Sequence, residues 1–352
     1  MLSSLFMIQS LLTFRAPVSG RPGPSHVPRA KLPLTAPRRS WHRQGVADNL
    51  SGATGALMGR ISRGWALTKQ SWQVLKSDKS LVIFPVLSTL FGILALVAIW
   101  APVVIARGVF EGRPVDKHDP LFYIAGGVTA YVSTFIAVFF NVALTACAAR
   151  SMQGEDTKIG EGVSAAVQRI GPILAWTFVA TTVGLILRVI RDRVPAVGSI
   201  VAEIAGAAWA IATYFVVPVL AFEGSGPLPS LKRSSAVVKA RWGEGATGAA
   251  TISIVTFLAT VAIAIVGGVC GGALVSIRLL PIGAAVLVAT VAAVIVVSFI
   301  SAALSQIFRV AVYQYAVTGQ TPGGFDGQVL AAAFQGGDSG PSRYDPTTGR
   351  PL

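Results

Sequence analysis

Long, uninterrupted apolar stretches dominate the pattern of hydrophobic and polar positions along this chain. A helix needs about 20 apolar residues to cross a hydrocarbon core of about 30 Å, so each stretch predicts at least one transmembrane helix. The first four stretches are residues 81–106, 121–147, about 170–188, and 196–222.

The last apolar stretch is too long for a single crossing. Residues 246–308 contain one charge only, Arg278, which lies beside Pro281. We therefore predict two helices joined by a tight turn at this point. The predicted fold class is all-α: a polytopic membrane protein with six transmembrane helices.

Composition and charge agree with a membrane protein. Of the 352 residues, 53% are hydrophobic and 12% are charged, whereas soluble domains have a charged share of about 25%. The net charge of +14 would also suit a nucleic-acid-binding protein. Cytoplasmic loops enriched in Lys and Arg explain the same excess, so we expect no nucleic-acid partner.

The distribution of basic residues predicts which side the loops occupy. With both ends of the membrane domain inside, the inner segments from Met58 onward hold 15 Lys and Arg residues and the outer segments hold 7. Because cytoplasmic loops carry the excess of positive charge, we expect an N-in, C-in topology in the cell membrane.

The two ends of the chain differ from the membrane domain expected at 58–320. Residues 1–57 are rich in Pro, Ser and Arg, with Asp48 as the only acid. This composition predicts a disordered basic leader, with an organellar transit peptide or a start of translation at Met58 as alternatives. Residues 321–352, rich in Gly, Pro and Asp, predict a disordered tail.

A short amphipathic segment precedes each odd-numbered span on the proposed cytoplasmic side. Before the fifth span, Leu231, Val238 and Trp242 share one face of a predicted helix with Ser230 as its N-cap. Spacings of four and three occur before the first and third spans, at Ile61, Trp65, Thr68, Trp72 and Leu75, and at Ile159, Val163, Ala166 and Ile170. We predict three interfacial helices.

These helices are expected to lie in the headgroup plane, with Trp at the lipid boundary and basic side chains toward anionic lipid. The partners we expect are therefore membrane lipids with anionic headgroups, with other membrane proteins or a second copy as further candidates. Simple anchoring and recruitment or gating at the surface are both open roles. The interfacial candidates are Trp65, Trp72, Lys232, Arg233, Lys239, Arg241 and Trp242.

Polar residues inside the spans are costly and are candidates for function. Arg188 and Glu203 flank the loop near residue 195 at similar depth on adjacent helices, and we predict that they pair. A structural pair and a transport or proton-relay role both remain open. Asn141, in the second span, is expected to hydrogen-bond a neighbouring helix.

The fifth span contains two overlapping pairs of glycines, Gly267 with Gly271 and Gly268 with Gly272. Small residues at this spacing let two helices approach closely, so we predict a packing role. A discontinuous span of the kind that lines transporter sites is the alternative.

Nothing in the sequence predicts a catalytic, cofactor-binding or metal-ligating residue. The histidines His26, His42 and His118 lie outside the predicted spans, and neither H-E-x-x-H nor G-x-x-x-x-G-K-[ST] occurs. Cys147 and Cys270 lie in apolar stretches and provide neither a disulfide framework nor zinc spacing. We expect no cofactor, and an intramembrane enzyme ranks last among the functions considered.

Three stretches resemble a family of uncharacterised six-span prokaryotic integral membrane proteins. YFVVPVLAFEGSGPLPSLKRSSAVVKARWGEG at 214–245 matches through a span that ends in Val-Pro, an acid and a basic Ser/Trp helix. YQYAVTGQTPGGFD at 313–326 follows the sixth span, and GWALTKQSW precedes the first. The matching residues are Pro218, Glu223, Ser234, Tyr313, Tyr315 and Gly319, together with Trp242.

That family is in turn similar to the membrane domain attached to some glycerophosphodiester phosphodiesterases. The resemblance covers about 58–335 and implies six helices in a prokaryotic inner membrane. It brings no substrate or catalytic residue and carries no hydrolase activity to this chain. Two functions are open: a non-catalytic membrane module that organises lipid or partner proteins, and a transporter or channel-like protein that uses Arg188, Glu203 and the glycine-rich fifth span.

Overall fold

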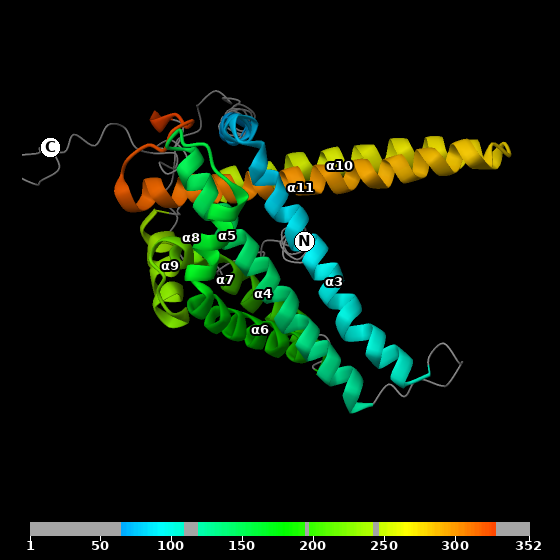
Figure 1. Ribbon diagram of the computed structural model, residues 1–352, viewed down its shortest axis with the longest axis horizontal. Helices are drawn as coiled ribbons and strands as arrows, with labels where there is room; N and C mark the ends of the chain where they lie inside the picture. The colour runs from blue at the N-terminus through cyan, green and yellow to red at the C-terminus, as the bar shows by residue number, and fades with distance from the viewer. Residues whose placement is uncertain (1–64, 109–118, 194–196, 242–245, 329–352) are drawn as a thin grey trace, which may run out of the picture. The chain divides into compact units, whose positions relative to one another are not determined.

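Six long apolar helices are present in a computed structural model of the chain (Figure 1). All described residues belong to one unit, Ile61–Leu352. They form helices and turns without any strand, so the predicted all-α membrane fold is confirmed. The described residues are 65–108, 119–193, 197–241 and 246–328. The predicted leader, 1–57, and most of the predicted tail lie outside them.

The predicted spans agree closely with the observed helices. The third span continues past its predicted end at Arg188 and stops at Arg193. The first span opens with a 3-10 turn, η1, at Lys79–Val82. The helices that form the spans are α3 (Ile83–Ala106), α4 (Pro120–Ser151), α6 (Ile170–Arg193), α7 (Val197–Ala212), α8 (Val216–Phe222), α10 (Ala246–Ser276) and α11 (Leu280–Thr318).

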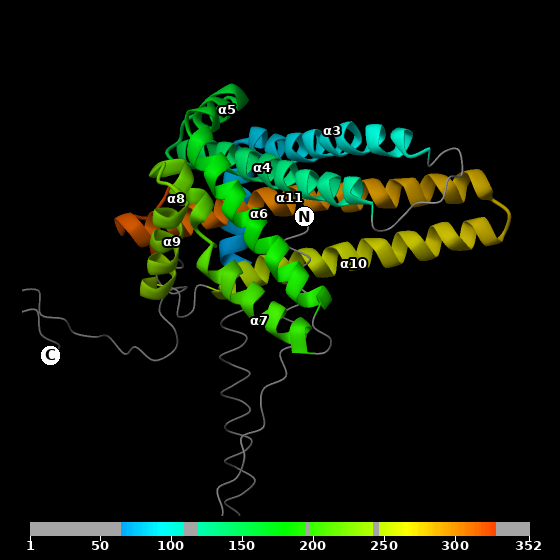
Figure 2. The same cartoon turned by 90° about the horizontal axis from the view of Figure 1, so that it is seen from below.

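Consecutive spans pack as helical hairpins. α3 lies beside α4, α6 beside α7, and α10 beside α11 (Figure 2). The tight turn predicted near Arg278 is present, because α10 ends at Ser276 and α11 begins at Leu280. Arg278 itself has a φ of 65°, a left-handed conformation that costs an L-residue roughly 1–2 kcal/mol.

The buried core lies at one end of the spans. In α4 nearly all buried side chains fall between Val138 and Ala149, and in α11 nearly all fall between Ala303 and Tyr313. The opposite halves leave large apolar side chains uncovered, such as Val288 at 69% exposure. Apolar surface costs about 25 cal/mol per Å² in water, so lipid is the solvent that suits these halves.

Short helices precede the first, third and fifth spans, as predicted. They are the helical residues 65–77, α5 (Ile159–Gln168) and α9 (Pro227–Arg241). In α5, Ala166 is buried and Val163 packs against the core, in line with the predicted apolar spacing. The three short helices therefore belong to the packed end of the protein.

The other two short helices bury a stripe that coincides only in part with the predicted apolar face: Leu75 and Val238 are buried, and Leu231 packs against the core. In residues 65–77 the buried side chains are Leu67, Ser71, Val74 and Leu75, whereas Trp65 and Trp72 face outward. In α9 they are Ser230, Ser234, Val237 and Val238. Small and aliphatic side chains fit against the neighbouring helices at these sites, whereas a Trp ring would not, so only tertiary packing decides which face is buried.

The fourth span is interrupted, although its sequence predicts one continuous helix. α7 ends at Ala212 and α8 begins at Val216. Pro218 accounts for the interruption: it has no N–H for the carbonyl of Tyr214, and its ring would clash with that carbonyl in a regular helix. The N–H of Phe215 instead donates to the Ser234 hydroxyl oxygen of α9 at 3.0 Å.

Candidate functional site

A polar cluster joins three segments where the fourth span ends. The Glu223 carboxylate, at the end of α8, accepts a hydrogen bond from Nε of Arg233 in α9 at 2.9 Å. The same oxygen accepts one from the Tyr313 hydroxyl in α11 at 2.6 Å. Glu223 and Tyr313 are both among the residues that match the family pattern, but that pattern does not indicate a contact between them. The fold brings them together.

Aromatic rings enclose the tyrosine of this cluster. The Tyr313 ring stacks on Phe222 with centroids 5.9 Å apart and also contacts Phe215 at 5.8 Å. Only 3% of Tyr313 is exposed, so its hydroxyl needs a partner to offset the loss of water. Glu223 supplies that partner.

Arg233 lies at the more exposed side of the cluster. The hydrogen bond from Arg233 to Glu223 raises the pKa of the guanidinium group, so Arg233 is charged at any physiological pH. Exposed ion pairs contribute at most about 1 kcal/mol. The pair therefore orients α9 against α8 more than it stabilises the fold.

The remaining motif residues have structural roles around this cluster. Ser234 and Pro218 are both buried and define the interruption of the fourth span from its two sides. Gly319 ends α11 with a φ of 71°, and its N–H donates to the carbonyl of Tyr315. A left-handed residue after the last turn is the usual helix stop, and glycine adopts it without strain.

A second arginine, this one in α11, lies next to the interruption. Arg309, one helical turn before Tyr313, holds its guanidinium 4.6 Å from the centre of the Tyr214 ring. One turn earlier still, buried Gln306 donates to the Thr145 hydroxyl of α4 at 2.7 Å. In the sequence, Arg309 directly follows the last apolar stretch, 246–308, which gives no hint of its contact with Tyr214. The spacing of Gln306, Arg309 and Tyr313 along one helix face could have identified this stripe.

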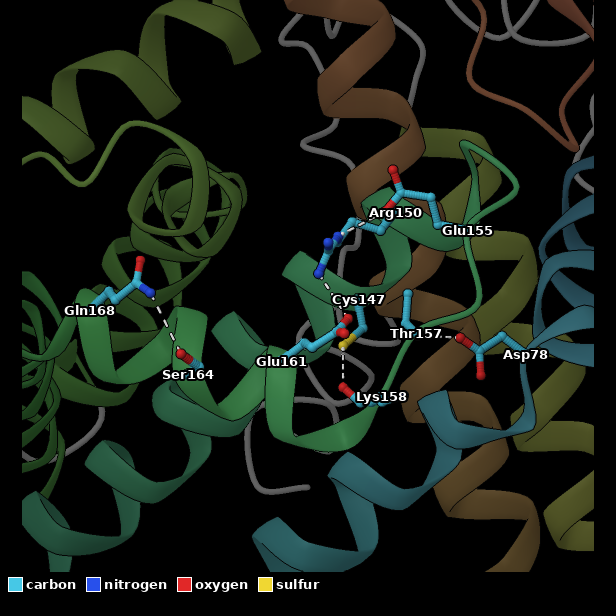
Figure 3. A network of polar contacts seen from close by, with 9 residues as sticks. All are labelled: Asp78, Cys147, Arg150, Glu155, Thr157, Lys158, Glu161, Ser164 and Gln168. Carbon is cyan, nitrogen blue, oxygen red and sulfur yellow. Dashed lines mark hydrogen bonds and ion pairs between the residues drawn. The ribbon is translucent and has the colours of Figure 1, made fainter.

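A second polar network connects α4, α5 and the start of the first span (Figure 3). Arg150 forms ion pairs with Glu155 at 2.9 Å and with Glu161 at 2.8 Å. The Thr157 hydroxyl donates to the Asp78 carboxylate, which also accepts the N–H of Ser80 and so caps η1. The network fastens the loop between α4 and α5 to the segment that precedes the first span.

A close approach of α5 to α4 accompanies this network. A Cβ on Gly162 would lie 2.6 Å from Sγ of Cys147 and 2.9 Å from the carbonyl oxygen of Ala143. Only glycine fits at this point. Cys147 is buried in this contact, and its thiol donates a weak hydrogen bond to the carbonyl of Lys158 at 3.8 Å.

The predicted pair of Arg188 and Glu203 is not formed. Arg188 lies 3.7 Å from Asp192, one turn further along α6, and both side chains are exposed. Glu203 is exposed and has no ion pair among the residues that the structure describes. An acid at the i+4 position of the same helix is the partner of Arg188 instead.

Asn141 also bonds within its own helix, where its amide nitrogen donates to the carbonyl of Ala137 at 2.7 Å. The sequence predicted a bond to a neighbouring helix. The backbone carbonyl one turn earlier is always within reach of such a side chain, and the expected bond between helices is made by Gln306 and Thr145 instead.

The glycines of the fifth span divide into two faces. A Cβ on Gly267 would lie 2.0 Å from Oγ1 of Thr290, and one on Gly271 would lie 2.7 Å from Leu287, both in α11. A Cβ on Gly268 or Gly272 would meet nothing within 4 Å. One glycine pair therefore lies against α11, and the other faces away from it.

The interfacial candidates lie mainly on the outside of the short helices. Trp65 is 56% exposed and Trp72 is 38% exposed, with Nζ of Lys76 lying 5.8 Å from the Trp72 ring. Lys232 and Lys239 are exposed, and Arg233 is held by Glu223. The side chain of Arg241 and the whole of Trp242 lie outside the described part.

Within residues 65–108, 119–193, 197–241 and 246–328, no group of three or more His, Cys, Asp or Glu side chains could hold a metal ion. The histidines all fall outside these ranges.

Comparison with known proteins gives one result. Residues 121–325, more than half of the chain, match the model of a family described as a family of unknown function (DUF6159). Neither curated proteins nor solved structures give a match. The matched region contains all six motif residues from Pro218 to Gly319. The similarity to the membrane domain of phosphodiesterases stays a prediction.

Proposed function

The chain belongs to this family of unknown function, and we propose that it is a non-catalytic membrane module that organises anionic lipid or partner proteins at one membrane face. The observation that carries the proposal is the way in which the short helices of the protein pack against its core. Residues 65–77 and α9 each bury one stripe against the core and turn aromatic or basic side chains outward.

The arrangement of the spans supports the proposal that these outward side chains all lie at the same face of the membrane. In antiparallel spans, the starts of odd-numbered helices and the ends of even-numbered ones lie at the same face. The bond between Glu223 and Tyr313 joins the ends of the fourth and sixth spans, and the pair of Arg150 and Glu161 joins the second span to the helix before the third. The excess of basic residues favours the cytoplasm for this face.

The chemistry of the surface suits a membrane boundary. Trp rings prefer the headgroup level, where their ring is in an apolar region and their N–H can reach water. Each Lys or Arg near an anionic leaflet contributes about 1 kcal/mol of attraction. Trp65 and Trp72 would set the depth of the first short helix, and Lys232 and Lys239 would attract acidic lipid to α9.

The proposal is tested by the lipid that accompanies the protein. The full chain is reconstituted in mixed bilayers of phosphatidylglycerol and phosphatidylcholine, extracted, and its bound lipid measured by mass spectrometry. We expect enrichment of phosphatidylglycerol, reduced about fivefold per charge removed in Lys232→Gln with Lys239→Gln. Arg188→Gln with Arg193→Gln, at the other end of the third span, is the control. Equal enrichment in both double variants would rule out the basic face.

A transporter is the second candidate, and the interruption of the fourth span favours it. Broken membrane helices and buried charged groups are common at transporter sites, and Arg309 lies beside the break. The discriminating measurement is ion and proton flux in liposomes for the wild type, Arg309→Gln and Glu203→Gln. Flux that one of these variants abolishes supports transport, whereas a wild type without flux supports the non-catalytic module.

A further inference from the structure

Arg169 and Gly224 lie in contact at one membrane boundary. Arg169 directly precedes the third span, which begins at Ile170, and Gly224 follows the fourth, which ends at Phe222. A Cβ on Gly224 would lie 2.2 Å from Nη1 of Arg169 and 2.7 Å from its Cζ. The guanidinium of Arg169 therefore lies against the loop that follows the fourth span.

Two acids in the segments next to Arg169 have other partners. Glu223, the neighbour of Gly224, binds Arg233 and Tyr313. Glu161, in the helix that Arg169 ends, binds Arg150. Among the residues that the structure describes, the Arg169 side chain has no hydrogen bond and no ion pair. Within the described part of the chain, the charge of Arg169 is therefore paired with neither of these acids.

The segment that leads from α8 into α9 contains one glycine and two serines next to Arg169. Gly224 has a φ of 60° and carries no side chain that would cover the guanidinium. Beyond it, the hydroxyl groups of Ser225 and Ser230 lie 3.1 Å apart at the start of α9. The partial positive charge of a helix N-terminus adds to that of Arg169.

We propose that Arg169 and the loop 223–226 bind the phosphate group of an anionic lipid. The inference rests on the proposed function, because it names a specific binding site on the same membrane face. A guanidinium has five N–H donors in a planar fork and can bind two phosphate oxygens at once. Arg233 adds a second positive charge at the rim of the loop. A lipid phosphate and inorganic phosphate offer the same oxygens, and only the lipid is held at this boundary.

The test measures lipid binding to the full chain in detergent by native mass spectrometry, with phosphatidylglycerol, phosphatidylcholine and inorganic phosphate as probes. We expect phosphatidylglycerol to bind the wild type more tightly than phosphatidylcholine. Arg169→Gln should weaken that binding about tenfold or more, because a charge-assisted hydrogen bond is lost. Arg169→Lys, which keeps the charge without the fork, should give an intermediate loss.

Two glycine variants keep the test decisive if Arg169→Gln does not fold. Gly224→Ala adds a methyl group that must displace the Arg169 side chain. Gly319→Ala imposes the same left-handed strain, at a φ of 71°, where a Cβ meets nothing within 4 Å. We expect Gly224→Ala to lose phosphatidylglycerol and Gly319→Ala to bind it like the wild type.

The outcomes separate this site from the wider proposal. Wild-type affinity for phosphatidylglycerol in both Arg169→Gln and Gly224→Ala overturns the site. If the Lys232 and Lys239 double variant still loses lipid enrichment in that case, the module function stands without it. Binding of inorganic phosphate that is as tight as that of the lipid, and equally sensitive to Arg169→Gln, supports the anion site and assigns it to a soluble phosphate.

Discussion

The Tyr313 hydroxyl lies 2.6 Å from Oε1 of Glu223, although the two residues are in different spans. This hydrogen bond ties the end of the sixth span to the end of the fourth, and Arg233 extends the connection to α9. The Tyr313 hydroxyl is buried and the Glu223 carboxylate is only partly exposed to water. Each group therefore needs the other as its hydrogen-bond partner. Their relationship therefore has a measurable energetic consequence.

Tyr313→Phe is expected to lower the free energy of unfolding by about 1–2 kcal/mol, through loss of one hydrogen bond to a charged group. Glu223→Gln should cost more, because it also removes the ionic partner of Arg233. The measurement is unfolding of the purified chain in detergent. If the two residues interact, the effects in the double variant are not additive, and fully additive losses would contradict a direct bond.

Gly162→Ala should destabilise the protein by about 1–3 kcal/mol, the usual cost of adding a methyl group to a packed interior. The new Cβ would meet Sγ of Cys147 and the backbone of Ala143. Gly160→Ala, in the same helix and with nothing within 4 Å, is the control, and it should be neutral or stabilising by up to about 1 kcal/mol. Equal melting temperatures for the two variants would show that α5 does not pack closely on α4.

Ser234→Ala should cost about 1–3 kcal/mol, because it removes the hydroxyl oxygen that accepts the buried N–H of Phe215. Its neighbour Ser235 donates only to the carbonyl of Lys232 in its own helix, so Ser235→Ala should have little effect. Thermal unfolding of the two variants side by side provides the comparison. A Ser234→Ala variant as stable as Ser235→Ala would mean that α9 does not cap the interrupted span.

Gly267→Ala should disturb the hairpin of α10 and α11, because its Cβ would collide with Thr290. Gly268→Ala, one residue further along, points away from α11 and should be tolerated. Formation of a disulfide between cysteines introduced in the two helices, compared across both variants, reports their separation. The glycine-packing interpretation fails if Gly268→Ala is the more disruptive change.

Orientation in the membrane is tested with single cysteines in a variant that lacks Cys147 and Cys270. Lys239→Cys, on exposed α9, should react with an impermeant maleimide only from the cytoplasmic side. Arg278→Cys, in the turn between α10 and α11, should react only from the opposite side. Labelling of both from the same side would contradict six crossings, and reversed accessibility would contradict the N-in, C-in topology.

Hydrophobic patterning predicts the spans well, because each apolar run is long enough to cross a bilayer and the bilayer imposes a fixed length. Even the turn near Arg278 follows from length alone. The short helices were also predictable from their spacing. Which of their faces is buried was not, because Trp65 and Trp72 are apolar in sequence yet face outward, and buried Ser71, Ser230 and Ser234 do not read as core residues.

The candidate site was predictable only in part. Similarity to a family pointed to Glu223, Ser234 and Tyr313, but the pattern did not say that two of them meet. Arg188 and Glu203 drew attention as intramembrane charges, and their depths matched. Depth gives only the position of a residue along the membrane normal and does not give its rotation about the helix axis. Similar depth was therefore not enough to predict a pair, and Arg188 binds Asp192 instead.

The sequence by itself determined that this chain forms six long apolar helices and which stretches they occupy, because local hydrophobicity and the length of a membrane crossing decide both. The tertiary structure alone decided how Glu223, Arg233 and Tyr313 come together, why Pro218 interrupts a span that Ser234 then caps, and that Arg169 lies on Gly224. These contacts depend on the rotation and packing of helices far apart in sequence, which no local pattern of residues specifies.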